Sequence, residues 1–396
     1  MSAATPQRVW TYVTTRLGLR AYLRAPGDGR RWPVIPAEVL LWAQVVGYLL
    51  REGAFHAVEA LVRSRARRRL GVAQPFSDDA LAYFTERLDP SPTRDALVTA
   101  VRQAKRNKAF DDVLFLGLVV DGSTVCHCTT APCPLCHPLT DAHGEVVGYQ
   151  HKLSLLSLVG GPLVLPLDVE PYGPGDSEQA ASVRLLQRGV AALGRRFAQY
   201  VVGDGLYASA PFLHAAGDLK LHTVVRLKAN LPTLLAAAEA RFTTQPPPMT
   251  LEIEGDRVEL WDADDFDSWD ALRWPTVRVL RYRQHHRDGT IVDAYWLTDF
   301  PATRLSSPTL YRLAKSRWTI ENQGFNDGKT RYGLDHIPHH HPNSLLLHWL
   351  LVALVLTIER LYRLRYLRRG THAPNTPIQF LRRLRLSLGV PVLDTG

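Results

Sequence analysis

The first part of the chain repeats apolar residues with a helical period. Between residues 37 and 50 apolar side chains recur three and four positions apart, and a second run of this kind covers residues 54–62. Ser77 precedes two acidic residues, a combination typical of a helix N-terminus. We therefore expect residues 1–112 to form an all-α N-terminal domain.

Basic residues gather near the ends of these expected helices. One group contains Lys105, Arg106 and Lys108, and an earlier arginine-rich group covers residues 63–69. Short helices with such clusters suit contact with the phosphates of duplex DNA, but solvated helix faces have the same composition. Both interpretations stay open for this region, and we take Lys105, Arg106 and Lys108 as candidate DNA-binding residues.

A different pattern begins at residue 113. Residues 113–120 form a continuous apolar run, as expected of a strand buried on both faces, and the run ends at Asp121-Gly122. The following patterns place further elements at residues 152–158 (strand), 163–169 (strand), 177–198 (helix), 200–203 (strand), 210–216 (helix) and 222–227 (strand). The order β-β-β-α-β-α-β predicts a mixed α/β sheet with flanking helices over residues 113–240.

The last third of the chain contains two further kinds of pattern. Short alternating segments with Gly-Asp and Asp-Gly turns indicate a β-rich insertion over residues 241–300. A helical period returns over residues 301–368, and residues 369–396 form a basic C-terminal tail. The longest apolar run, residues 345–358, is shorter than the ~20 residues that span a bilayer, so it predicts a buried helix.

Charge and targeting signals narrow the choice of partner and compartment. The formal net charge is +9 and the isoelectric point is about 9.5. A basic excess suits a polyanionic partner, with a membrane surface or simple solubility as rival explanations. Residues 1–20 lack the continuous apolar core of a signal peptide. We expect a cytoplasmic protein that has no membrane partner.

Two aspartates occupy equivalent places in this pattern. Asp121 and Asp204 each end an apolar strand, and each is followed by glycine. Strand ends in an α/β sheet are where side chains converge on a ligand, although Asp-Gly after a single strand is usually a plain turn. We expect the glycines to allow close approach of backbone or phosphate.

Residues 317–329 form a stretch that supplies a third acid. Read as a helix, it places Arg317, Glu321 and Phe325 one turn apart on one face, with Lys329 a further turn on. A surface ladder of salt bridges has the same spacing. Together with the two aspartates, however, Glu321 would complete a hard-oxygen site for two Mg²⁺ or Mn²⁺ ions, as used in phosphoryl transfer.

The element order, the acids at Asp121 and Asp204, and the stretch Arg317-Trp318-x-Ile320-Glu321-Asn322-x3-Asn326-x2-Lys329 resemble the DDE transposases of prokaryotic insertion sequences. The resemblance covers residues 113–365. It implies an RNase H-like catalytic domain that is interrupted by the β-rich insertion and preceded by the all-α domain. It also implies that Asp121, Asp204 and Glu321 are the catalytic acids, and that Arg317 and Lys329 contact DNA near the cleaved phosphate.

Two positions depart from the pattern of that family. A tyrosine usually stands three residues before the arginine, where this chain has Ala314, and Tyr311 lies one turn earlier. The lysine usually follows the glutamate by seven residues, where this chain has Gly328 and the lysine comes one residue later. Glycine inside a helix costs about 1 kcal/mol relative to alanine, so we expect the helix to end before Lys329.

The cysteines predict a second metal site. All four lie within eleven residues, in the pattern Cys126-x-Cys128-x4-Cys133-x2-Cys136. Four such thiolates fit a closed, tetrahedral structural Zn²⁺ knuckle in a hairpin over residues 123–143. His127 or His137 could replace one cysteine, and four free thiols in a mobile loop are the alternative.

Other side chains are weaker candidates. His151 could lie near the acids or be a buried structural histidine, and Glu170 and Asp176 could join the acidic site or lie in a solvated turn. We interpret residues 339–341, three consecutive histidines, as a loop and not as a ligand cluster.

Aromatic residues of the expected insertion are also candidates. Related transposases use an aromatic side chain of this region to stack on a flipped base, so the resemblance singles out Trp296. Trp274 and Trp269 are equally placed by sequence, and core packing is the alternative for all three.

The sequence therefore predicts a DNA transposase that cleaves transposon ends and transfers the strands into target DNA by a DDE two-metal mechanism. Its expected partner is double-stranded DNA, as terminal inverted repeats and as target, bound by a homodimer or larger assembly. A catalytically inactive DNA-binding protein and a stand-alone RNase H-like nuclease are the alternatives. We expect a cytoplasmic, nucleoid-associated protein of a prokaryote.

Overall fold

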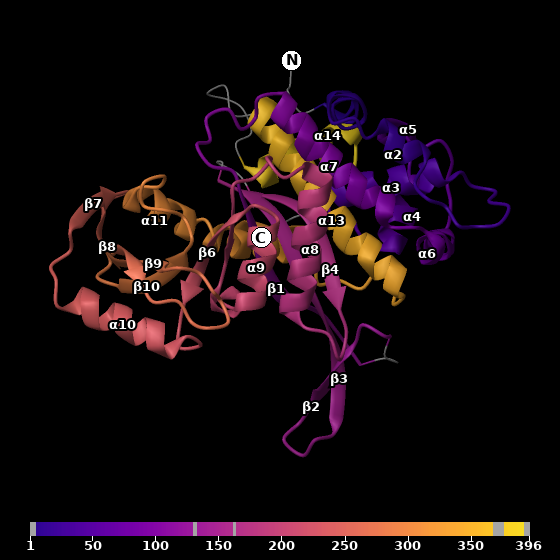
Figure 1. Ribbon diagram of the computed structural model, residues 1–396. Helices are drawn as coiled ribbons and strands as arrows, with labels where there is room; N and C mark the ends of the chain where they lie inside the picture. Colours follow the sequence, from indigo (N-terminus) through magenta and orange to yellow (C-terminus); the bar gives the residue numbers. More distant parts are fainter. Residues whose placement is uncertain (1–4, 130–132, 161–163, 367–375, 392–396) are drawn as a thin grey trace.

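A single mixed sheet forms the centre of the molecule. The computed structural model describes residues 5–129, 133–160, 164–366 and 376–391. Within these residues a 10-stranded sheet has the order β2-β3-β1-β5-β6-β10-β9-β8-β7, with β4 also paired to β3 (Figure 1). The strands are β1 (Gly117–Cys128), β2 (His137–Thr140), β3 (Val146–Val159), β4 (Leu165–Tyr172), β5 (Tyr200–Gly203), β6 (His222–Leu227), β7 (Met249–Ile253), β8 (Asp256–Phe266), β9 (Val277–His285) and β10 (Ile291–Thr298). The predicted mixed α/β fold is confirmed.

The chain order of the catalytic part matches the predicted order. Strands β1, β3 and β4 are followed by α8 (Glu178–Leu193), β5, α9 (Ala210–Asp218) and β6, and the short strand β2 is an addition within the hairpin before β3. β1, β5 and β6 are parallel, whereas β3 runs antiparallel to β1. Strands β1 and β5 are buried throughout the residues that pair in parallel, which explains why these parts of their sequences are continuously apolar.

Strand β1 is longer than its apolar run and does not end at Asp121. It begins at Gly117, not at residue 113, and continues through Asp121 to Cys128. The reason is its partner: β3 pairs with β1 from Val159 back to Tyr149, well beyond the short parallel contact with β5. The hairpin formed by β2 and β3 projects from the body of the molecule (Figure 1).

The β-rich region continues the central sheet. Strand β10 pairs antiparallel with β6 on one side and with β9 on the other, and β8 and β7 follow. This half of the sheet lies to one side of the molecule with α10 (Pro232–Thr243), which packs on β8 (Figure 1). The chain then returns to the catalytic part through α11 (Ser307–Lys315), which packs against β6, β8 and β9.

The N-terminal region is helical within the described residues 5–112. Its helices are α1 (Pro6–Thr11), the π-helix η1 (Tyr12–Arg16), α2 (Arg20–Arg24), α3 (Ala37–Leu49), α4 (Phe55–Arg63), α5 (Arg67–Leu70), α6 (Asp78–Arg87) and α7 (Ser91–Arg106). Three of them, α3, α6 and α7, pack on α13 (Pro342–Tyr366). This contact joins the N-terminal helices to the catalytic part.

The long helix α13 is the predicted buried helix. Within the described residues it alone has the length and apolar composition of a membrane span, and 94% of its most apolar window is buried inside the fold. One side of it packs on β4 and the other on the N-terminal helices. Its burial in the protein core accounts for the apolar sequence.

Part of the expected basic tail is a helix that packs on the N-terminal region. The described residues 376–391 contain α14 (Pro377–Leu388), whose Thr376 caps the first turn. Arg385 of α14 donates a hydrogen bond to the backbone oxygen of Leu50 at 2.7 Å and pairs with Glu52 at 3.0 Å. Residues 367–375 and 392–396 of the region lie outside the described residues.

Candidate active site and metal centre

Asp121 and Asp204 lie at the same level of two adjacent parallel strands. β1 and β5 pair in register from Gly117 with Tyr200 to Val119 with Val202, and each aspartate lies two residues beyond the last pair. Asp204 directly follows β5 and caps the short 3-10 helix η2 (Gly205–Tyr207), where its Oδ1 accepts a hydrogen bond from the backbone N–H of Leu206 at 2.8 Å. The sheet therefore brings the two predicted acids together.

Asp121 lies in an acidic and largely buried environment. Burial raises the pKa of Asp121 to about 7; the Arg317 guanidinium opposes this shift, and the Asp204 and Glu178 carboxylates add to it. The Oδ2 atom of Asp204 in turn lies 3.3 Å from the ammonium of Lys228. Converging carboxylates of this kind favour a divalent cation, which would offset their mutual repulsion and bind through hard oxygen ligands.

The third acid is connected to the first by an arginine. Glu321 lies in the π-helix η3 (Ile320–Asn326), and its side chain is 56% exposed. The Nη1 atom of Arg317 lies 3.6 Å from Oε2 of Glu321 and 3.9 Å from Oδ2 of Asp121. Arg317 thus places one cation between the carboxylates of Glu321 and Asp121, at ion-pair distance and without a hydrogen bond from its Nη1 atom to either.

The π-helix changes the register of this stretch. A π-turn accommodates one more residue than an α-turn, and the helix continues beyond it as α12 (Asp327–Tyr332). The expected helix end before Lys329 is therefore wrong. The expected common face is confirmed for Arg317 and Glu321, which form an ion pair one turn apart, but is wrong for Phe325, which is buried whereas Glu321 is exposed.

Lys329 contacts the strand that carries Asp121. Its ammonium donates hydrogen bonds to Oγ of Ser123 and to the backbone oxygen of Thr124, both at 2.9 Å. Gly328 packs against the side chain of Leu334, which would lie 3.1 Å from a Cβ added at this position. The extra residue of the π-turn accounts for a lysine that stands one position late in the sequence and yet reaches β1.

Glu178 is a fourth acid that the sequence argument did not select. It is the first residue of α8, and its carboxylate accepts hydrogen bonds from the hydroxyls of Tyr207 at 3.0 Å and Tyr172 at 3.4 Å. A Cβ on Gly122 would lie 2.1 Å from Cδ of Glu178. The glycine after Asp121 therefore makes room for this side chain, and not for phosphate as we expected. A first-turn glutamate is common at helix N-termini, so its sequence context carried no signal.

Trp296 is a core residue. Its side chain is fully buried on β10, and its ring meets that of Trp318 edge-on at 5.8 Å between centroids. A fully buried indole cannot stack on a base, so the prediction of a DNA contact at Trp296 is wrong for this structure. Trp269 and Trp274 are half-buried and also pack against the core.

The other aromatic candidate near the site, Tyr311, faces away from the acids. It is buried on α11, packs edge-on against Tyr282 at 5.0 Å, and donates a hydrogen bond to Oε1 of Gln284 at 3.2 Å. Its partners are residues of β9, so Tyr311 attaches α11 to the β-rich region.

Basic residues of α7 and of the segment after α8 share one surface. We call the exposed residues Arg102, Lys105, Arg106, Arg195 and Arg196, which line a shallow open pocket, the basic strip. The ammonium of Lys105 lies 4.1 Å from the centroid of the Phe197 ring, so part of its charge already has a partner.

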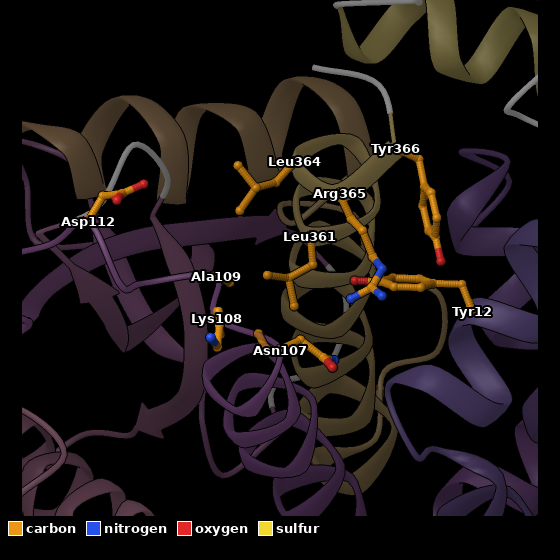
Figure 2. A pocket seen from close by; sticks show the side chains of 10 residues that line it. Tyr12, Asn107, Lys108, Ala109, Asp112, Leu361, Leu364, Arg365 and Tyr366 are labelled. Carbon is orange, nitrogen blue, oxygen red and sulfur yellow. The ribbon is translucent and has the colours of Figure 1, made fainter. Parts of the chain in front are cut away.

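Lys108 lies on another side of the helix end. With Asn107 it lines a pocket between the C-terminus of α7, Tyr12 and the last turns of α13 (Figure 2). Arg365 and Tyr366 border the same pocket. The structure therefore separates Lys108 from the basic strip that contains Lys105 and Arg106.

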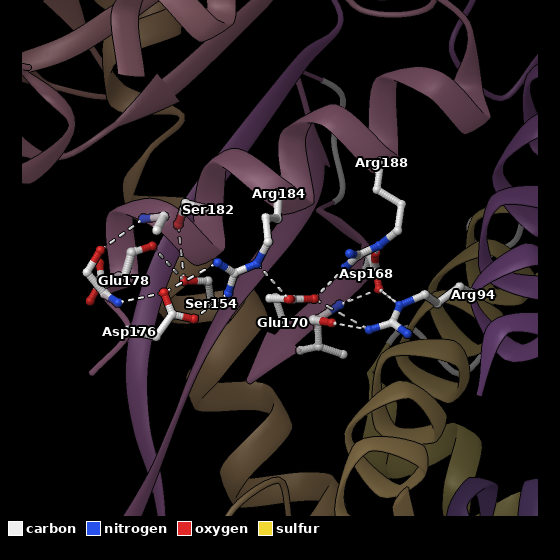
Figure 3. A network of polar contacts seen from close by, with 12 residues as sticks. Arg94, Ser154, Asp168, Glu170, Asp176, Glu178, Ser182, Arg184 and Arg188 are labelled. Carbon is white, nitrogen blue, oxygen red and sulfur yellow. Dashed lines mark hydrogen bonds and ion pairs between the residues drawn. The ribbon is translucent and has the colours of Figure 1, made fainter. Parts of the chain in front are cut away.

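Glu170 and Asp176 belong to a network of ion pairs with arginines of α7 and α8. Arg184 pairs with Glu170 at 3.0 Å and with Asp176 at 2.5 Å, and Arg188 pairs with Glu170 at 2.8 Å. Figure 3 shows Arg184 and Arg188 of α8 and Arg94 of α7 gathered around Asp168 and Glu170 of β4. Their carboxylates thus already have cationic partners, and the network joins α7, α8 and β4.

The cysteine region contains a candidate metal site with an unexpected composition. The ligand atoms of Cys128, Cys136, His151 and His340 all lie within 4.8 Å of one another. Cys126 does not join them, because its sulfur faces the backbone oxygens of Leu334 and His336. The structure therefore replaces part of the predicted four-cysteine set with two histidines.

The remaining predicted ligands have different surroundings. Cys133 lies beside the cluster, with its sulfur 3.6 Å from that of Cys136 and 3.3 Å from Nε2 of His151. His137 interacts instead with the backbone oxygen of Tyr172 at 2.8 Å, and His127 is exposed. Residues 339–341 form a loop, as predicted, but His340 belongs to the candidate metal site, since its Nε2 faces Cys136 at 3.4 Å.

Comparisons with known proteins identify the family of the chain. The family model described as "Transposase DDE domain" matches residues 116–358. Comparison with curated protein sequences finds no match. Among solved structures, the chain is similar to a chain of the piggyBac transposase synaptic complex with hairpin DNA, with a TM-score of 0.46 and 12% identity over 97% of this chain and 80% of that chain. Since the family model spans more than half of the chain, the protein belongs to the family of transposase DDE domains.

Proposed function

We propose that the protein is a DNA transposase that cleaves the ends of a transposon and joins them to target DNA by a DDE two-metal mechanism. One observation carries the proposal: Asp121 and Asp204 share a level of two parallel strands, and Arg317 links Glu321 to Asp121. Carboxylate oxygens of this kind are the ligands that an Mg²⁺ or Mn²⁺ pair uses in phosphoryl transfer.

Each residue of the site has a distinct part in this proposal. Asp121, Asp204 and Glu321 would hold the two ions. When bound, such ions activate the attacking oxygen and stabilise the leaving oxygen in an in-line displacement at phosphorus. Asp121 must lose its proton to act as a ligand, and its neighbour Arg317 favours that ionised form. Arg317 and Lys329 would then steady the phosphate backbone beside the acids.

The DNA partner would be double-stranded, as terminal inverted repeats and as target. The net charge of +9 and the basic strip support attraction to phosphates, and such binding weakens steeply with salt. We further propose that the active form is a homodimer or larger assembly on DNA, and that the protein is encoded by a prokaryotic insertion sequence and works in the cytoplasm at the nucleoid. The family match supports this assignment only at the level of a DDE transposase.

A cleavage and joining assay tests the proposal. The substrate is a labelled duplex that contains the genomic DNA flanking the coding region, incubated with a supercoiled plasmid and Mg²⁺. Wild-type protein should nick the ends to leave a 3′-OH and join them to the plasmid. Glu321→Gln, Asp121→Asn and Asp204→Asn should each lower the rate by more than about 100-fold, equivalent to about 2.7 kcal/mol of transition-state stabilisation.

A matched variant controls for non-specific effects. Glu252→Gln changes an exposed glutamate of β7 and should leave the rate unchanged. Binding without cleavage by the wild type would identify an inactive DNA-binding protein, and cleavage without joining would identify a nuclease. Either result, or full activity in Glu321→Gln, contradicts the proposal.

A further inference from the structure

Four side chains from separate segments lie close together where β1 and β3 meet the loop after α12. Cys128 ends β1, Cys136 precedes β2, His151 lies on β3, and His340 lies in the loop between α12 and α13. The Sγ atom of Cys136 lies 3.4 Å from Nε2 of His151 and 3.4 Å from Nε2 of His340. Two imidazole nitrogens thus face a single sulfur.

The spacing of these atoms suits a tetrahedral ion. With bonds of about 2.3 Å to sulfur and about 2.0–2.1 Å to nitrogen, ligand atoms around tetrahedral zinc lie roughly 3.3–3.8 Å apart. The two measured sulfur–nitrogen distances fall in this range, and all four ligand atoms lie within 4.8 Å of one another. Cys₂His₂ is also an established ligand set for structural zinc.

The cluster is protected from solvent. His151 is fully buried and Cys136 is buried, while Cys128 and His340 are half-buried. The ring of Trp349 lies 6.1 Å from that of His151 and covers it from the side of α13. Four protein ligands would fill the coordination sphere and leave no open position for a substrate, so the site suits a structural ion and not a catalytic one.

We propose that Cys128, Cys136, His151 and His340 bind a structural zinc ion. The ion would link strands β1 and β3 and the segment before β2 to the loop between α12 and α13. The ion would cross-link Cys136 and His340, which lie 204 residues apart in the sequence. The same two segments also meet where Cys126 faces the backbone oxygen of His336. An ion between them would therefore reinforce an existing contact.

This cross-link has a consequence for the acids, which rests on the proposed function. β1 carries Asp121, and α12 carries Lys329 immediately after the helix of Glu321. Lys329 already bridges the two elements through Ser123 and Thr124. A zinc ion would connect β1 to the segment after α12 at a second place and would keep β1 and α12 from separating.

Metal analysis of the full-length protein tests the proposal independently of transposition. Protein purified without chelator should contain one zinc per chain by mass spectrometry, and Co²⁺ exchanged into it should show thiolate-to-cobalt charge-transfer bands and a tetrahedral visible spectrum. Removing the metal with a strong chelator should lower the midpoint of thermal unfolding by several degrees, and adding Zn²⁺ should restore it.

Variants of single cysteines and histidines identify the ligands. Cys136→Ser and His340→Gln should each lower retained zinc by at least about tenfold, in line with the loss of a first-sphere ligand. Cys126→Ser and His341→Gln are the matched controls, since neither side chain belongs to the cluster, and both should retain one zinc. Hydrogen exchange should become faster in residues 146–151 and 336–341 of His340→Gln while the rest of the described chain stays protected.

Three results would overturn the proposal. They are the absence of zinc and cobalt binding by wild-type protein, equal zinc loss in Cys126→Ser and Cys136→Ser, and unchanged zinc content in both Cys136→Ser and His340→Gln. Circular dichroism of each variant shows whether it is folded. Because His340 lies in a half-buried loop, its variant tests the ligand set even if Cys136→Ser fails to fold.

Discussion

Gly122 and Glu178 occupy adjoining space: a Cβ on the glycine would lie 2.1 Å from Cδ of the glutamate. The carboxylate is held there by hydroxyl groups of Tyr207 and Tyr172, so an added Cβ must displace either that side chain or the backbone next to Asp121. We therefore expect Gly122→Ala to displace Glu178 and to lower the cleavage rate by about tenfold or more, equivalent to about 1.4 kcal/mol. Single-turnover cleavage at saturating Mg²⁺ measures this effect.

Gly217→Ala is the control for that substitution. Gly217 lies in α9, and nothing surrounds the position of an added Cβ within 4 Å. Its replacement should leave cleavage unchanged and make the protein slightly more stable, because alanine favours a helix over glycine by about 1 kcal/mol. Equal activity of the Gly122 and Gly217 variants would show that the position of Glu178 does not matter.

Trp296→Phe should weaken the fold and not the contact with DNA. The indole is fully buried and packs on Trp318, so a smaller ring leaves a gap in the core. We expect a loss of about 0.5–3 kcal/mol in the free energy of unfolding, measured by urea denaturation. DNA affinity at fixed salt should stay the same.

The matched control for Trp296 is Trp32→Phe, because Trp32 is 94% exposed and its replacement opens no cavity. It should leave the free energy of unfolding unchanged. A Trp296→Phe protein that keeps its stability but loses DNA affinity would restore the base-stacking hypothesis.

Stability should depend on pH through His348. Its Nε2 lies 2.9 Å from the backbone oxygen of Gly333 and therefore donates, so Nδ1 accepts from the hydroxyl of Tyr48 at 2.5 Å. Burial lowers the pKa of His348 to about 3. Between about pH 6.5 and pH 3 this histidine is therefore protonated in the unfolded chain and neutral in the folded chain. The contribution to stability is complete above pH 6.5 and is lost as the pH falls through this window.

The expected slope for this one group approaches 1.4 kcal/mol per pH unit. We expect His348→Gln to lack that component, which urea denaturation of both proteins at pH 5, 6 and 7 would reveal. Other titrating groups contribute equally to both slopes. Identical slopes in the two proteins would mean that His348 is protonated in the fold.

Two arginines of the basic strip should set part of the salt dependence of DNA binding. Arg195 and Arg196 are exposed and lie beside Arg102 and Arg106. Replacing both with alanine should reduce the slope of log affinity against log salt by up to about 2, because each neutralised phosphate releases about one counterion. Replacement of both with lysine keeps the charge and should keep the slope. An unchanged slope in the alanine variant would exclude the strip from the DNA interface.

The sequence predicted the fold and the neighbouring positions of Asp121 and Asp204 because both depend on local pattern. Buried parallel strands are continuously apolar, so the runs before Asp121 and Asp204 marked neighbouring strands even though β1 continued beyond its run. Glu321 was identified through the resemblance of its surrounding residues. These signals lie within short segments and need no knowledge of distant contacts.

The parts that the sequence did not predict depend on contacts between distant segments. His340 joins the cysteines only because the loop after α12 folds back on the hairpin. The π-helix that carries Glu321 and the burial of Trp296 likewise depend on packing, since neither has a distinctive local composition. The role of Glu178 likewise follows from its contact with Gly122, which lies 56 positions away in the sequence.

Strand β10 joins the two halves of the sheet into one continuous hydrogen-bonded layer. It is hydrogen-bonded to β6 along one edge and to β9 along the other, and β6 is bonded to β5, the strand that precedes Asp204. A load applied to the outer strands would pass through backbone hydrogen bonds toward that aspartate, with no flexible tether in between. The β-rich region is therefore joined to the strand before Asp204 by backbone hydrogen bonds and not by a flexible linker.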